Sequence, residues 1–190
     1  MPSHKIAIIV GSLRKDSLNL KVAKSICAFA ENLDCTIVEI GDLPLFNQDL
    51  EGTPPAAWVR FRQDIRAADG VLFVTPEYNR GIPGVLKNAI DVGSRPYGQS
   101  VFFKKPGAIV SASPGMIGGF GANHQVRQAC VFLDMPVMQH PEAYLGQVSD
   151  ASFDEGGCLK DGDLKDLIRK LSEAFHDWVD VIIRARAALA

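Results

Sequence analysis

The fold of this chain is decided by the stretch Lys5-Ile6-Ala7-Ile8-Ile9-Val10-Gly11-Ser12-Leu13-Arg14-Lys15-Asp16-Ser17-Leu18-Asn19. Residues 6–10 form a continuous apolar run rich in β-branched side chains, which is typical of a strand buried on both faces. A polar loop follows over residues 11–19, and apolar residues then recur at helical spacing over residues 22–33. This order of strand, loop and helix predicts the start of a β-α-β unit.

The same alternation continues along the rest of the chain. Further strands are predicted at residues 36–40, 71–74, 108–112 and 136–139. Helices are predicted at residues 59–68, 85–92, 126–133 and 161–188. Five β-α units predict an α/β fold with a doubly wound, five-stranded parallel sheet and helices on both faces. At 190 residues, we expect residues 1–190 to form a single domain.

The charge balance narrows the classes of partner. The chain carries 20 Lys and Arg against 22 Asp and Glu, a net charge of −2. Proteins that bind nucleic acid or membrane surfaces usually show a basic excess, so we expect neither partner. Small molecules and other proteins remain as candidate partners.

The cysteines and the apolar pattern indicate the compartment. Cys27, Cys35, Cys130 and Cys158 are scattered, without a Cys-x-x-Cys pair or a zinc-ligand spacing, and no metal site is predicted. The sequence shows no signal-peptide pattern and no apolar run of the ~20 residues that cross a bilayer. We therefore expect a cytoplasmic protein.

The loop at residues 11–19 has the composition of a phosphate-binding loop. It lacks the Gly-x-Gly-x-x-Gly of dinucleotide folds and the Gly-Lys-Ser/Thr of a P-loop. Instead it offers two hydroxyls, an amide and a guanidinium beside the free N–H groups of a helix start. A terminal phosphate monoester suits these donors and the helix dipole. The alternative is a solvated turn in which Ser17 serves only as the helix N-cap.

Two more loops follow predicted strands and reach the same sheet edge. Residues 75–84 combine two prolines and two glycines with the ring of Tyr78, as the wall for a flat amphipathic ligand would require. A surface turn before a helix that starts at Pro83 is the alternative. Residues 111–119 are small and Gly-rich, so a ligand could approach their backbone closely.

These loops carry a family resemblance. Four segments resemble the NADPH-dependent FMN reductase family: Gly11-Ser12-Leu13-Arg14-x-x-Ser17-x-Asn19, Thr75-Pro76-Glu77-Tyr78-Asn79, Ile82-Pro83-Gly84-x-Leu86-Lys87-Asn88-Ala89-Ile90-Asp91, and residues 113–119. Within it, the chain looks most like the chromate/quinone reductase branch. The resemblance implies a flavodoxin-like fold with strand order 2-1-3-4-5, non-covalently bound FMN and either NADPH or NADH as electron donor.

The resemblance also implies site residues. Those expected to hold the FMN phosphate are Ser12, Arg14, Ser17, Leu18 and Asn19. Those expected to line the isoalloxazine ring or the ribityl chain are Pro76, Glu77, Tyr78, Asn79, Ser113 and Gly115. Arg80 is a candidate for drawing an anionic acceptor or the 2′-phosphate of NADPH toward the flavin by its positive field. No side chain is assigned an acid–base role, because the flavin supplies the chemistry.

The activity that the resemblance implies is a ping-pong transfer of electrons from NAD(P)H through FMN to quinones, chromate or similar small acceptors. It also implies a homodimer or homotetramer. One alternative is a flavodoxin-type electron carrier that serves a protein partner, although such carriers are usually strongly acidic. The other is a non-enzymatic regulatory or scaffold protein on the same fold.

Overall fold

A computed structural model describes residues 3–189. The strands are β1 (His4–Val10), β2 (Leu33–Val38), β3 (Gly70–Thr75), β4 (Gly107–Ala112) and β5 (Ala143–Leu145). The helices are α1 (Leu18–Phe29), α2 (Ala56–Ala67), α3 (Gly84–Ser94), α4 (Phe120–Phe132) and α5 (Asp163–Ala188), with short 3-10 helices η1 (Gln48–Leu50) and η2 (Asp150–Ser152).

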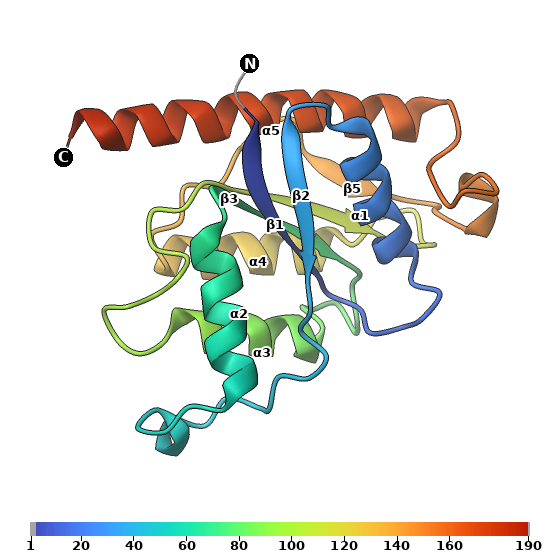
Figure 1. Ribbon diagram of the computed structural model, residues 1–190. Coiled ribbons are helices and arrows are strands. Elements are labelled where there is room, and N and C mark those ends of the chain that lie inside the picture. The colour runs from blue at the N-terminus through green and yellow to red at the C-terminus, as the bar shows by residue number, and fades with distance from the viewer. Residues whose placement is uncertain (1–2, 190) are drawn as a thin grey trace.

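All five strands are parallel and lie in the order β2-β1-β3-β4-β5. The chain therefore winds outward from β1 in both directions, as Figure 1 shows. The predicted doubly wound, five-stranded sheet is confirmed.

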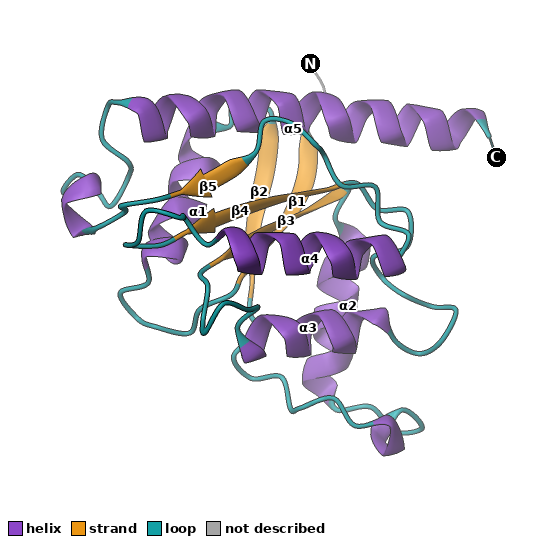
Figure 2. Ribbon diagram, turned by 180° about the vertical axis from the view of Figure 1, so that it is seen from behind, coloured by secondary structure: helices purple, strands orange, loops and turns teal. Residues whose placement is uncertain are grey.

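The strands bury both of their faces. In β1, Ile6 and Ile8 pack in one apolar cluster with α1 and α5, while Ala7 and Ile9 pack in a second cluster with α2, α3 and α4. Every residue of β3 and β4 is buried. Figure 2 shows the same layering, with α5 along one side of the sheet and α2, α3 and α4 on the other. Continuous apolar strands are what this two-sided burial requires.

The fifth strand was predicted at residues 136–139, and this prediction is wrong. Val137 makes only an isolated parallel bridge with Gly107, although Val137 and Met138 are buried. The fifth strand is β5, which pairs with residues 110–112 of β4. Burial beside the start of β4 explains the apolar pattern of residues 136–139.

The bounds of several elements also differ from the prediction, most clearly where the first helix ends and β2 begins. The first helix ends at Phe29, and Leu33 begins β2 rather than closing that helix. The side chain of Leu33 is buried in the cluster that contains α1, which explains why it continued the apolar pattern of that helix.

Among residues 3–189, no helix has the length and apolarity that a membrane crossing needs.

Gly93 allows α3 to pack closely against the core. A Cβ atom built there would lie 2.4 Å from the Phe102 ring and 3.2 Å from that of Phe61. We expect Gly93→Ala to lower the free energy of unfolding by about 1–3 kcal/mol through overpacking. Gly84→Ala, in the same helix, is the control because nothing lies within 4 Å of its added Cβ. Urea unfolding of both variants measures the difference, and equal midpoints would contradict the packing argument.

Candidate functional site

The carboxyl ends of β1, β3 and β4 bring the three predicted loops together. The Gly11 N–H donates to the carbonyl of Val74 at 2.8 Å, which extends the pairing of β1 with β3 into the first loop. The Asn19 side-chain amide donates to the carbonyl of Ala112 at 3.0 Å, so the start of α1 is tied to the end of β4. The predicted meeting of these loops at one sheet edge is therefore present in the structure.

Glycine at position 11 permits this close approach. A Cβ atom there would lie 2.7 Å from Thr75 Oγ1 and 3.1 Å from a methyl group of Leu86. Any larger residue would push the first loop away from the end of β3 and from α3, since contacts this short do not occur between unstrained atoms.

The first loop ends in a capped helix start. The Ser17 hydroxyl accepts a hydrogen bond from the Leu20 N–H at 3.3 Å, as an N-cap does. The N–H groups of Leu18 and Asn19 lie in the first turn and have no acceptor within the helix. They and the positive end of the helix dipole favour an anion at this place. Arg14 is exposed in the same loop, and its backbone N–H donates to Ser12 Oγ at 3.4 Å.

The loop after β3 is a tight hairpin with fixed geometry. Tyr78 and Gly81 exchange two backbone hydrogen bonds of 3.1 and 3.0 Å. Asn79 and Arg80 between them have φ values of 51° and 66°, a region that few residues other than glycine adopt. The turn therefore holds its backbone in a shape that the surrounding structure must support.

Two side chains supply that support. Gln125 on α4 accepts from the Ile82 N–H at 3.0 Å and donates to the Arg80 carbonyl at 3.2 Å. Glu77 accepts from the Ala122 N–H at 3.1 Å and pairs with Arg80 at 3.1 Å. The Glu77 side chain is only 10% exposed, so its carboxylate anchors the loop to the start of α4. The sequence pattern did not reveal Gln125, which lies more than 40 residues from the loop that it holds.

The loop after β4 packs closely on β5. The Ser113 N–H donates to the Leu145 carbonyl at 3.0 Å, and the Gln147 N–H donates to the Gly115 carbonyl at 3.1 Å. Gly118 has a φ of 64°, and a Cβ atom there would lie 2.5 Å from the backbone of Tyr144. Glycine is required at position 118 for both reasons.

Apolar side chains are exposed around these loops. Between 46% and 82% of the surface of each is accessible, and they are Leu13, Tyr78, Met116, Ile117 and Phe120. We call these five residues the apolar rim. Exposed apolar side chains from three loops at one sheet edge provide surface that a flat ligand can cover.

A polar group lies next to the rim. The Tyr144 hydroxyl donates to Glu142 at 2.8 Å and lies 3.0 Å from His124 Nε2. Burial and the hydrogen bond to Glu142 raise the pKa of Tyr144. The phenol therefore stays protonated near neutral pH. His124 and Tyr144 also contact the ring of Phe120, with centroid distances of 4.1 and 5.2 Å from that ring.

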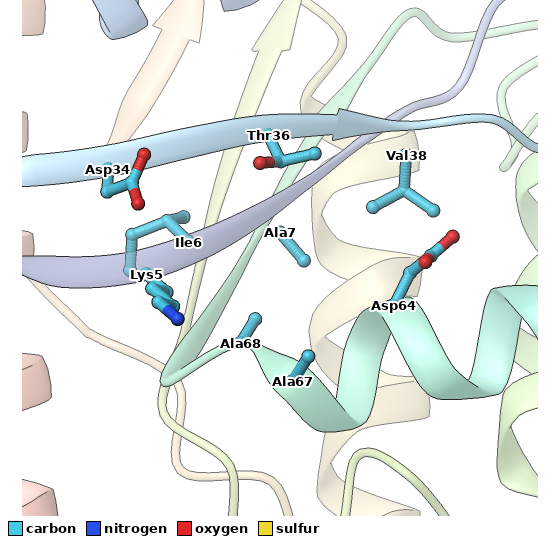
Figure 3. Close-up of a pocket in the computed structure, with 9 residues that line it drawn as sticks. All are labelled: Lys5, Ile6, Ala7, Asp34, Thr36, Val38, Asp64, Ala67 and Ala68. Atoms are coloured by element: carbon cyan, nitrogen blue, oxygen red, sulfur yellow. The ribbon is translucent and has the colours of Figure 1, made fainter.

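A separate hollow of about 310 Å³ lies along β1, β2 and the end of α2. Figure 3 shows its polar groups, which include Lys5, Asp34 and Asp64. Six of its nine lining residues lie in β1 and β2, and none of the predicted binding residues takes part. This hollow is not part of the candidate site.

Comparisons with known proteins agree on one family. A family model for NADPH-dependent FMN reductase matches residues 4–150. The chain belongs to the NADPH-dependent FMN reductase family.

Individual relatives of this FMN reductase cover nearly the whole chain. A quinone reductase from Pseudomonas putida is 57% identical over 178 residues, which are 93% of this chain and 95% of the relative. A 2-hydroxy-1,4-benzoquinone reductase from a Burkholderia species is 42% identical over 176 residues, with 92% and 96% covered. The solved structure of the flavoenzyme NAD(P)H:(acceptor) oxidoreductase FerB from Paracoccus denitrificans matches with a TM-score of 0.88 and 39% identity, covering 93% of this chain and 97% of that one.

The residues present in this FMN reductase fit the cofactor of its family. Asn19 is 3% exposed, and its Oδ1 atom has no hydrogen-bond partner within residues 3–189. A buried acceptor without a donor is costly, and a hydroxyl or amide donor on a bound molecule would satisfy it. Together with the free N–H groups of the first turn, it suits a ligand that combines a phosphate with a polar chain.

The structure places the predicted site residues at one edge of the sheet. In the first loop these are Ser12, Arg14, Ser17, Leu18 and Asn19, and in the other two loops they are Pro76, Glu77, Tyr78, Asn79, Arg80, Ser113 and Gly115. Ser17 and Asn19 are buried, whereas Arg14, Tyr78, Asn79, Arg80 and Gly115 are exposed. Their individual contacts with FMN remain predictions.

Arg14 provides a test of the phosphate assignment. We expect Arg14→Ala to weaken FMN binding about 10- to 100-fold, because hydrogen bonds to charged groups contribute ~1.5–3 kcal/mol. Lys15→Ala removes an equal charge from the neighbouring exposed position and is the control. Titration of each apoprotein, followed by flavin fluorescence, gives its dissociation constants for FMN and for riboflavin. Riboflavin has no phosphate, so an equal loss of affinity for riboflavin in Arg14→Ala would refute the assignment.

Proposed function

We propose that this FMN reductase transfers electrons from NAD(P)H to quinones at the edge formed by the three loops. The observation that carries the proposal is the hydrogen bond from the Asn19 side chain to the Ala112 carbonyl. It fixes the loop at residues 11–19, which has the composition of a phosphate-binding loop, beside the Gly-rich loop at residues 111–119. When bound, FMN supplies hydride acceptance and electron release.

The residues of the chain would hold and orient the cofactor. The first turn of α1 and Arg14 would bind the phosphate, and Asn19 Oδ1 would accept a hydrogen bond from the cofactor. The backbone of residues 76–79 would line the flavin ring. Glu77 would act indirectly, since its carboxylate already binds the Ala122 N–H and Arg80.

Quinones are the acceptors that the observations favour. Two relatives that match more than 90% of this chain are named as quinone or benzoquinone reductases. The apolar rim offers flat, non-directional contact of the kind that an aromatic or quinonoid ring uses. Chromate is a second proposed acceptor, and the donor and the acceptor would bind in turn in a ping-pong cycle.

Assembly and location are also proposed. We expect a homodimer or homotetramer, in which a second copy of the chain would cover part of the exposed apolar surface. Four free cysteines in the described chain fit a reducing cytoplasm.

Anaerobic mixing tests the activity directly. We expect FMN-loaded protein to lose its visible flavin absorbance rapidly on mixing with NADPH and to regain it when a benzoquinone is added. Initial rates at varied concentrations of both substrates should give parallel double-reciprocal lines. An electron carrier would keep its absorbance until a separate reductase is added, and its net charge would normally be far more negative than −2.

An Arg80 variant tests which nicotinamide cofactor, NADPH or NADH, the protein prefers as electron donor. Its side chain is 74% exposed, and its Nη1 atom lies 3.1 Å from Glu77 Oε1. We expect Arg80→Ala to lower kcat/KM for NADPH by roughly 2- to 5-fold, the effect of one exposed charge, with little change for NADH. Lys87→Ala, on the exposed face of α3 and paired with Asp91, is the control. Equal kcat/KM values in Arg80→Ala and the unaltered protein, for NADPH, NADH and chromate, would exclude a role for this charge.

A further inference from the structure

Helix α4 begins where the loop after β4 ends, and its first turns also contact the loop after β3. Ala122 and Gln125 form hydrogen bonds with the loop after β3. Phe120 and His124, one turn apart on the same helix, instead contact Tyr144 of β5, with ring centroids 5.2 and 5.9 Å from its ring. His124 therefore lies beside the two loops at which the acceptor is proposed to bind.

The ring of His124 is exposed at the apolar rim. Its centroid is 4.1 Å from that of Phe120, which belongs to the rim. An acceptor ring that covers Phe120 would therefore come within reach of the imidazole. His140 is exposed as well, but among residues 3–189 none of the hydrogen bonds or ring contacts of this cluster involves it.

Hydrogen bonds assign the proton on the His124 ring. The Tyr144 hydroxyl donates its one hydrogen to Glu142 Oε1 at 2.8 Å. Its oxygen lies 3.0 Å from His124 Nε2 and is left to accept there, which assigns an N–H to Nε2. Nδ1 is then the ring position that gains and loses a proton.

The charges around the cluster favour a protonated imidazole. The Glu142 carboxylate reaches His124 through a single hydroxyl group, so it balances a positive charge on the ring. Burial and the hydrogen bond to Glu142 raise the pKa of Tyr144, so the phenol keeps its hydrogen while the imidazole titrates. Arg127, the other charged group that faces Tyr144 in the described chain, is held by Asn123 and opposes that rise in pKa.

We propose that His124 gives a quinone the proton that its reduction requires, and that Tyr144 and Glu142 position the imidazole. This inference rests on the proposed function. A quinone takes up two electrons and two protons to become a hydroquinone, whereas NAD(P)H supplies both electrons with only one proton. The second proton must therefore come from solvent. The N–H bond at Nδ1 of the imidazolium breaks as an O–H bond forms on the quinone, and solvent then protonates the ring again.

NMR tests the state of the ring without turnover. The oxidised, FMN-loaded protein is labelled at its histidine nitrogens, and the signals of His124 are those lost in His124→Gln. We expect the neutral ring to carry its hydrogen on Nε2. Tyr144→Phe removes the acceptor and should weaken this preference, whereas the signals of His140 should not move. A hydrogen on Nδ1 in the unaltered protein would overturn the proposal.

Two acceptors separate the proton from the electrons. Ferricyanide takes up one electron and no proton, whereas benzoquinone takes up both. A positioned acid contributes ~10²–10⁴-fold, so we expect His124→Gln to slow benzoquinone reduction about 100-fold and ferricyanide reduction by no more than about 2-fold. His140→Gln, at another exposed histidine, is the matched control. Equal losses with the two acceptors, or no loss with benzoquinone, would contradict the assignment.

The pH profile distinguishes a proton donor from a structural role. The rate with benzoquinone should fall as the pH rises through the range in which imidazolium loses its proton, and His124→Gln should remove this dependence. The same dependence in His124→Gln would overturn the proposal. The flavin spectrum, the thermal midpoint and the elution volume confirm that each variant is folded and assembled like the unaltered protein. Failure of NADPH to reduce the flavin of the unaltered protein would instead refute the proposed function, and the NMR result still decides the assignment of the His124 ring.

Discussion

Burial of the central strands on both faces is the constraint on which the rest of this molecule depends. No residue of β3 or β4 is exposed, so helices must cover the sheet on either side. Each crossover then returns the chain to the same end of the sheet, and the loops after β1, β3 and β4 become neighbours. The apolar composition of the strands therefore determines where the three binding loops meet, and the sequences of the loops determine which ligand they can bind.

Tethers between distant residues fix those loops before any ligand arrives. Asn19 holds the start of α1 against the end of β4, and Gln125 and Glu77 hold the hairpin after β3 against α4. Each tether joins a side chain to backbone, and the Asn19 tether is buried whereas Gln125 is exposed. A site ordered in this way loses less conformational entropy when it binds a ligand. The tethers also explain how a turn with two non-glycine residues at positive φ can persist, since Gln125 on α4 binds both the Arg80 carbonyl and the Ile82 N–H.

Elements that depend on local sequence pattern could be predicted from the sequence. Contacts between residues far apart in the chain could not. The buried strands, the alternation with helices and the three loops follow from local composition, and the structure contains all of them. The fifth strand was misplaced because residues 136–139 and 143–145 are both short and apolar, and only pairing with β4 distinguishes them. The prediction that Glu77 lines the flavin stays a prediction, and the sequence did not indicate that its carboxylate accepts from the N–H of Ala122, 45 residues further along the chain. No local signal identifies such a partner.

Helix α1 is held at two places by buried polar contacts. At its start, the Ser17 cap and the Asn19 tether fix the helix against β4. Further along, the buried Ser25 hydroxyl donates to the Lys21 carbonyl at 2.9 Å and accepts from the Leu159 N–H at 2.9 Å, which joins the helix to the segment before α5. Because both places are fixed by contacts with other parts of the chain, α1 cannot tilt without breaking buried hydrogen bonds. The free N–H groups of its first turn therefore keep their place at the carboxyl ends of the strands.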